Sequence, residues 1–379
     1  MMGALHGIRV IDLTRILAGP FCTQLLADMG ADVIKIETPD GDPVRTQGAI
    51  VDGFSAYFAL FNRNKRSVVL DLYTERDRVA LTRLLADADV VVENYRPGVF
   101  AKMGFDTERL QALNPRLIVA SVNGYGSTGP YVDRPSFDFI AQAMSGFMAV
   151  NGDPDGPPRR AAPPISDLIA GLYCAFGVVS ALQARERTGR GQQVESSLTG
   201  GLISMLAYLS AETLNTGRNP ARTGNDHPIV APYGLFQASD GQIAVAPSND
   251  TFVARFLGAV GLSPLLEEPR FRDNASRLAN RAALTACIDA ATATRSVDHW
   301  IEAINRAGCP CGRVMELDEV FRDPQVLAQG MVIEWPREGR TPIRMTGFPV
   351  KLSDTPCELR LPPPELGEHD AEILGPQQR

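Results

Sequence analysis

The chain has 379 residues, 44% hydrophobic and 21% charged, a globular balance with room for two domains. Its net charge of −7 lacks the basic excess of general nucleic-acid binders, so no nucleic-acid partner is expected. The sequence opens without a signal-peptide pattern, and no uncharged run approaches the ~20 residues of a membrane helix. A cytoplasmic protein with no membrane partner is therefore expected.

The cysteines and histidines predict no metal site. The six cysteines are scattered apart from Cys309-Pro-Cys311, and the four histidines show no ligand spacing. A single C-x-C without a second pair or a nearby histidine does not form a zinc site, so reduced thiols are expected.

Short β-rich runs alternate with helical patterns over the first 120 residues. Strands are expected at 7–13, 32–37, 68–70, 90–92 and 117–120, with helices at 21–29, 75–88 and 106–113. This alternation predicts an α/β domain with a Rossmann-like parallel sheet. The loop after the first strand has no G-x-G-x-x-G, and Pro20 removes an N–H, so no nicotinamide or flavin cofactor is expected.

The rest of the chain predicts a second domain and a return to the first. Residues 121–136 are turn-rich at the end of a strand, where α/β sheets place ligands. Further along, helices are expected at 137–150 and 198–215, a strand at 193–195, a hairpin at 235–245 and mostly helices from 250 to 307, with Ser296 as a cap. Short strands are expected near 331–335 and 342–352. The expected domains are residues 1–215 (large domain), 216–232 (linker), 233–324 (small α+β domain) and 325–379 (a return segment completing the large domain).

Residues 161–192 predict a long, tightly packed helix with a carboxylate at its start. Apolar residues recur every three or four positions, and glycine, alanine and cysteine keep much of the remaining surface small. Asp167 lies at the N-terminal end of this pattern, where unpaired N–H groups favour a carboxylate. Two interpretations remain open from position alone: a helix cap beside Ser166, or a nucleophile.

Several segments, in order over nearly the whole chain, resemble the family III CoA-transferases, which include formyl-CoA transferase and carnitine CoA-transferase. They are RVIDLTRILAGPFCTQLLADMGADVIKIE, NRNKRSVVLDL, ADVVVENYRPGVFAKMGF, LNPRLIVASVNGYGSTGP, FDFIAQAMSG, TGRGQQVESS and LGEHDAEIL. The resemblance implies an acyl-CoA:carboxylate CoA-transferase whose nucleophile is Asp167, working through an aspartyl anhydride and an aspartyl-CoA thioester. It also implies an interlocked homodimer that acts on an acyl-CoA and a small carboxylic acid. The leading hypothesis for the donor is succinyl-CoA or a related dicarboxylate thioester, with a second dicarboxylic or hydroxy acid as acceptor.

The resemblance also implies where CoA is bound. Ile16, Leu17 and Ala18 are expected at the adenosine end, Asn94 and Tyr95 at the pantetheine or adenine, with Arg96 nearby. Lys102 is expected either at the phosphates or as a solvated charge on a helix. The candidates for holding a substrate carboxylate, because arginine offers a bidentate fork, are Arg15, Arg45, Arg134 and Arg222.

The sequence departs from familiar members of the family at two places. Residues 247–250 contain no glycine run where a glycine-rich loop is expected, which puts specificity for formyl-CoA and oxalate in doubt. Phe137 occupies the position of a base histidine in the related α-methylacyl-CoA racemases, which disfavours a racemase or epimerase because phenylalanine accepts no proton. A non-catalytic CoA-binding protein on the same scaffold is the other alternative.

Overall fold

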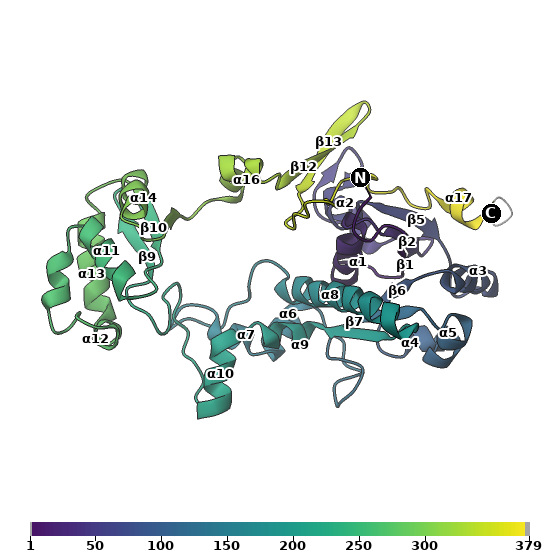
Figure 1. The fold of residues 1–379 in the computed structure, drawn as a ribbon, viewed down its shortest axis with the longest axis horizontal. Helices are drawn as coiled ribbons and strands as arrows, with labels where there is room; N and C mark the ends of the chain where they lie inside the picture. The colour runs from purple at the N-terminus through teal and green to yellow at the C-terminus, as the bar shows by residue number, and fades with distance from the viewer. Residues whose placement is uncertain (1, 376–379) are drawn as a thin grey trace. The chain divides into compact units, whose positions relative to one another are not determined.

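The computed structural model describes residues 2–375, which form two compact units (Figure 1). Of the described residues, the first unit comprises 2–148, 160–214 and 323–375, and the second comprises Ala149–Arg159 and Asn215–Arg322. Residues 149–159, which the sequence assigned to the large domain, group with the second unit.

A six-stranded parallel sheet forms the centre of the first unit, as the sequence predicted. Its order is β5-β2-β1-β6-β7-β8, and every neighbouring pair is parallel. The strands are β1 (Arg9–Asp12), β2 (Asp32–Glu37), β5 (Lys65–Val69), β6 (Val90–Glu93), β7 (Ile118–Asn123) and β8 (Gln193–Ser197). The prediction missed the start of β5, because its first residue is a fully buried lysine.

Helices cover both faces of this sheet. On one face, α1 (Ala18–Asp28) and α8 (Ile165–Thr188) share a buried core with β1, β6 and β7. On the other face, the core includes residues of α3 (Glu75–Ala86), α4 (Val99–Lys102) and α5 (Thr107–Leu113). Contrary to the expectation from the sequence, α8 is long and apolar enough to cross a membrane by length and composition, but core helices of globular proteins share these properties, and 44% of its apolar stretch is buried.

The start of α8 packs directly on the start of α1. A Cβ added to Gly171 would lie 2.4 Å from the carbonyl oxygen of Ala18 and 3.1 Å from Cδ1 of Phe21. Because the first of these atoms belongs to the backbone, it cannot move without shifting α1. Glycine at this position therefore sets the distance between the two helices.

We expect Gly171→Ala to lower the free energy of unfolding by about 1–3 kcal/mol, the usual cost of overpacking a close-packed site. A thermal melt followed by circular dichroism measures this. The control is Gly312→Ala, where an added Cβ meets no atom within 4 Å. Equal melting temperatures for the two variants would contradict the close helix contact.

Two helices expected as continuous are each interrupted. The pattern at 137–150 forms α6 (Asp138–Met144) and α7 (Phe147–Val150), separated by Gly146 with φ +86°. The pattern at 198–215 forms α9 (Leu198–Ser204) and α10 (Ala207–Thr216), separated by a turn at 205–206, after which Ala207 begins α10 with φ +49°. Apolar spacing continues across both breaks, so periodicity did not reveal them.

The second unit is built on an antiparallel sheet of order β11-β10-β9. Its strands are β9 (Gly234–Ala238), β10 (Gly241–Val245) and β11 (Cys311–Arg313). The predicted hairpin is confirmed. The core also includes α11 (Asp250–Ala259), α13 (Arg281–Thr292) and α14 (Val297–Arg306), with Ser296 capping α14 as predicted. The unit also contains α12 (Asn274–Ala279), α15 (Leu317–Val320) and the 3₁₀ helix Ser263–Glu267.

The final part of the chain adds to the first unit. It contains α16 (Pro324–Ala328), the antiparallel pair β12 (Val332–Arg337) and β13 (Arg340–Thr346), and α17 (Asp370–Leu374). The β12–β13 hairpin shares a small core with α2 (Ala56–Asn62), the 3₁₀ helix Pro43–Thr46 and β4 (Phe54–Ser55), which pairs with β3 (Ile50–Val51). Along edge strand β5, Ser67 N–H donates to His369 Nδ1 at 3.2 Å and Val69 N–H to Asp370 Oδ1 at 2.9 Å.

Candidate active site

A cavity of about 430 Å³ lies at the carboxyl ends of β1, β6 and β7. The strand order reverses between β1 and β6, and open parallel sheets bind ligands at such a reversal. The residues singled out in the sequence that line this cavity are Arg15, Ile16, Leu17, Ala18, Asn94, Tyr95, Arg96, Arg134, Phe137 and Asp167. Segments far apart in the chain therefore meet at one site with Asp167.

Three candidates lie elsewhere. Arg45 is bound to Glu37, with Nη2–Oε1 at 2.7 Å and Nε–Oε2 at 2.8 Å, so it serves as a structural ion pair. Arg222 belongs to the second unit and donates to backbone carbonyl oxygens of residues 149, 153 and 156. Lys102 is exposed at the end of α4 and is not part of the cavity lining. Neither the residue type nor the position in the sequence distinguishes these three cations from the arginines that line the cavity.

Asp167 is the third residue of α8 and does not cap it. The helix begins at Ile165 after Pro164, and no side chain caps it. Among the described residues, none forms a recorded hydrogen bond with the partly buried Asp167 carboxylate, which lines the cavity. The cap interpretation is therefore wrong, and the carboxylate is left available for a ligand.

The surroundings of Asp167 favour its neutral form. Burial, and secondarily the negative charge of Asp138, raises the pKa of Asp167 to about 7. Asp138 is itself fixed, because its Oδ1 accepts from Ser166 N–H at 3.0 Å and from Ser166 Oγ at 2.9 Å. Gln142 donates to the other oxygen at 2.8 Å. Asp138 thus holds the residue just before Asp167.

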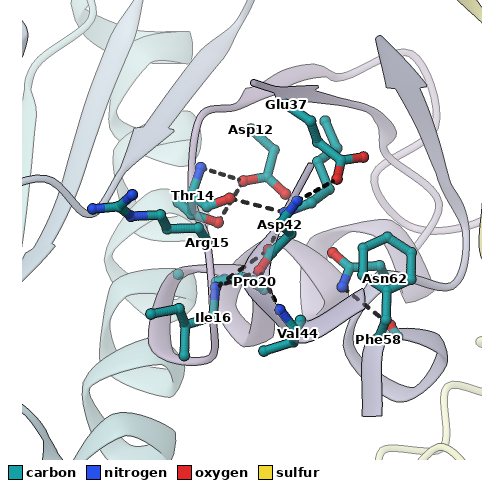
Figure 2. Close-up of polar contacts among 12 residues, drawn as sticks. Asp12, Thr14, Arg15, Ile16, Pro20, Glu37, Asp42, Val44, Phe58 and Asn62 are labelled. Carbon is teal, nitrogen blue, oxygen red and sulfur yellow. Dashed lines mark hydrogen bonds and ion pairs between the residues drawn. The ribbon is translucent and has the colours of Figure 1, made fainter. Parts of the chain in front are cut away.

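Arg15, Ile16 and Leu17 of the β1–α1 loop form part of the cavity wall. Arg15 N–H donates to Asn94 Oδ1 at 3.0 Å, and Asn94 Nδ2 donates to the Arg15 carbonyl at 2.8 Å. Asn94, expected at CoA, thus also ties the loop after β6 to the loop after β1. Thr14 is held in turn by Asp12, which accepts its N–H at 2.9 Å and its hydroxyl at 2.5 Å (Figure 2).

Sequence reasoning missed several groups at or near the site. Burial, followed by the charges of Asp167 and Asp42, raises the pKa of Tyr57 to about 12, so its phenol stays protonated at neutral pH. Burial raises the pKa of Glu93 to about 7, and Glu93 accepts the Tyr95 N–H at 2.7 Å. No sequence pattern distinguishes Tyr57, which lies in an aromatic run on a helix. Glu93 could have been found, because it directly precedes the predicted site residue Asn94.

The chemistry available at this site comes from side chains. Across residues 2–375, no group of three or more His, Cys, Asp or Glu side chains is placed to hold a metal ion. The site instead combines a carboxylate of raised pKa with Arg15, Arg96 and Arg134, three cations suited to phosphates or carboxylates. Residues 247–250, where a glycine-rich loop was sought, instead include Asn249, the N-cap of α11.

Such a fold and site are typical of an α/β enzyme that binds an anionic ligand at the carboxyl ends of its strands. Residues 5–370 match CoA-transferase family III, and the chain belongs to this family. It is therefore an enzyme that transfers CoA.

Relatives span nearly all of the chain. It is 42% identical to an acetyl-CoA:oxalate CoA-transferase of Acetobacter aceti, over 98% of this chain and 95% of that one. It is 38% identical to a succinate–glutarate CoA-transferase of Agrobacterium fabrum, over 98% and 94%. A crystal structure of a CAIB/BAIF family protein from Brucella suis superimposes with a TM-score of 0.88, at 40% identity and 99% coverage of each chain.

Proposed function

We propose that the protein is an acyl-CoA:carboxylate CoA-transferase whose nucleophile is the Asp167 carboxylate. The observation that carries this proposal is the position of Asp167: its carboxylate is partly buried, accepts no hydrogen bond from residues 2–375, and lines one cavity with every expected CoA-binding residue except Lys102. Burial keeps water from the activated aspartyl group, and the positive end of the α8 dipole favours negative charge there.

In each step of the proposed reaction, one nucleophile replaces one leaving group on a single carbonyl carbon. An Asp167 oxygen attacks the thioester carbonyl, the C–S bond breaks, and CoA thiolate leaves a mixed anhydride. The thiolate then attacks the aspartyl carbonyl, the anhydride C–O bond breaks, and the donor acid departs as its carboxylate. The acceptor carboxylate repeats these steps in reverse and leaves as the new thioester. At every stage one carbonyl remains activated, as a thioester or an anhydride, so no nucleotide is consumed.

We further propose a dicarboxylate thioester, with succinyl-CoA first, as the donor. Relatives at 37–38% identity are named for succinyl-CoA and mesaconate or for succinate and glutarate, all with a second carboxylate, whereas the relative at 42% is named for acetyl-CoA and the dicarboxylate oxalate. Arg15 and Arg134 line the cavity and are available for that carboxylate, whereas Arg45 and Arg222 are occupied elsewhere. The interlocked homodimer and the cytoplasmic location stay predictions.

A panel of CoA esters incubated with a panel of carboxylic acids, read by mass spectrometry, tests the proposal. New CoA esters of the added acids, formed in equal amount to the donor acid released, are expected. Loss of α-deuterium from 2-methylacyl-CoA without any such exchange would instead indicate a racemase. Phe137 opposes that outcome, because it lines the cavity where the racemase base is expected and accepts no proton.

We expect kcat/KM to rise with pH through a midpoint near 7. The pKa of Asp167 is raised to about 7, so below this pH the carboxyl is protonated and cannot attack, whereas above it the nucleophile is ionised. Asp138→Asn removes a charge that raises this pKa and should move the midpoint to lower pH. Initial rates at low acyl-CoA from pH 5 to 9 measure it, and an unmoved midpoint in the variant would contradict the assignment.

A further inference from the structure

Ile16, in the β1–α1 loop, has a backbone conformation that its side chain disfavours. Its φ is +71°, in the left-handed region that β-branched residues rarely adopt. The side chain packs against the small core that contains Val44 and Phe58. The backbone of Ile16 is therefore strained, and this packing offsets part of the strain. Strained backbone conformations persist only where surrounding contacts stabilise them.

The carboxylate of Asp42 holds this residue. Ile16 N–H donates to both Asp42 oxygens, at 3.1 Å from Oδ1 and 3.2 Å from Oδ2 (Figure 2). Oδ1 also accepts the Val44 N–H at 3.2 Å, and the Asp42 N–H donates to Glu37 Oε2 at 3.0 Å. The Asp42 side chain is only 1% exposed, so water does not compete for these bonds.

Lys35 joins Asp42 to the other end of the same loop. Its Nζ donates to Asp42 Oδ2 at 2.9 Å and to the Thr14 carbonyl at 2.8 Å, and its side chain is fully buried. Burial alone would lower the pKa of Lys35, but the nearby carboxylates, first of all Asp42, raise it above its ordinary value. Lys35 therefore remains a cation inside the protein and orients both groups.

We propose that Asp42, oriented by Lys35, is a positioning residue that holds Ile16 in its left-handed conformation and so shapes the cavity wall that receives the CoA ester. The inference rests on the proposed function for the identity of that ligand. Asp42 itself does not line the cavity. Its effect reaches the substrate through the backbone of residues 14–16.

This arrangement separates binding from bond formation. Asp167 lies on α8, where Asp138 holds the preceding residue without any contact to Asp42. Loss of Asp42 should therefore weaken binding of the CoA ester while leaving the nucleophile in place. A purely structural role would lower stability and leave the KM of the folded fraction unchanged.

The test is Asp42→Asn, alone and with Ile16→Gly. The amide retains one acceptor oxygen and loses the charge that Lys35 orients, so KM for the acyl-CoA should rise roughly tenfold, with little change in kcat. Glycine adopts a φ of +71° without penalty. In the Ile16→Gly background, Asp42→Asn should therefore raise KM much less than it does alone.

The matched control is Asp28→Asn. Asp28 is also buried and forms an ion pair with Arg63 at 2.8 Å, but it does not line the cavity. It should lower the melting temperature without raising KM. The inference is overturned if Asp42→Asn raises KM no more than Asp28→Asn does, or if glycine at position 16 leaves the Asp42→Asn effect undiminished.

Calorimetric titration with free CoA separates this inference from the proposed function. If the wild-type protein transfers CoA but Asp42→Asn has normal KM and normal CoA affinity, the inference alone is overturned. A wild-type protein that binds CoA but exchanges it with no acid overturns the proposed function, and a weaker CoA affinity of Asp42→Asn still supports the inference.

Discussion

Asp167→Asn is expected to reduce CoA transfer by about 10³-fold or more, because removal of a nucleophile leaves only binding and orientation to accelerate the reaction. The amide has the same shape as the carboxyl group but cannot attack a thioester carbonyl. Asp167 makes no recorded hydrogen bond to the described residues, so the variant should fold normally. Initial rates with excess donor and acceptor, and circular dichroism of the same samples, measure both effects.

Glu186→Gln is the control on the same helix, since Glu186 is exposed and its Arg116 partner is 3.8 Å away. It should leave the rate unchanged. The covalent step is tested separately: wild-type protein trapped with hydroxylamine during turnover should lose activity and carry a modification at Asp167, and Asp167→Asn should not. Turnover by Asp167→Asn at more than a few per cent of the wild-type rate would refute the mechanism.

Asp12→Asn should lower the free energy of unfolding by about 3–5 kcal/mol, because it leaves the buried cation of Lys65 without its counter-charge. Both side chains are fully buried, with Lys65 Nζ 3.0 Å from Asp12 Oδ2. Burial would raise the pKa of Asp12, but the charges of Lys65 and Lys35 hold it below its ordinary value. Thermal and urea unfolding, followed by circular dichroism, measure the loss.

Two further variants make this prediction specific. Glu334→Gln removes one partner of an exposed pair with Arg344 and should cost less than about 1 kcal/mol. The double variant Asp12→Asn with Lys65→Met removes both charges and should be more stable than Asp12→Asn alone. A double variant that is less stable than the single one would show that charge pairing is not the source of the effect.

The parallel sheet was predictable because most of its strands are short apolar runs between helical patterns. The bounds of β2 were predicted correctly at Asp32–Glu37, whereas β5 was placed too late, because Lys65 and Ser67 are paired inside the protein. The helix interruption at Gly146 was not predictable, because the apolar spacing continues across it. The short helix α2 was not predictable either, because it depends on packing against distant segments.

The site was predictable as far as family motifs identify single positions. Asp167 and the residues after β1 and β6 meet at one cavity, since the ends of parallel strands lie at one edge of the sheet. The partners of the arginines were not predictable. Arg45 pairs with Glu37 whereas Arg134 lines the cavity, and the neighbouring sequence does not distinguish the two arginines. The Asp42–Ile16 contact joins residues 26 positions apart through a backbone angle, which a single sequence does not reveal.

The start of edge strand β5 contacts residues that are synthesised long after it. Asn64 donates to the Glu358 carbonyl at 2.9 Å, and Arg63 donates to the Thr346 carbonyl at 2.8 Å, so these buried groups have no such partners while the chain is growing. The whole second unit is synthesised after the donors of these hydrogen bonds and before their acceptors. The contacts that cover the β5 edge are therefore completed only after translation of the second unit, and a nascent chain stalled before residue 346 would present that edge uncovered to chaperones and proteases.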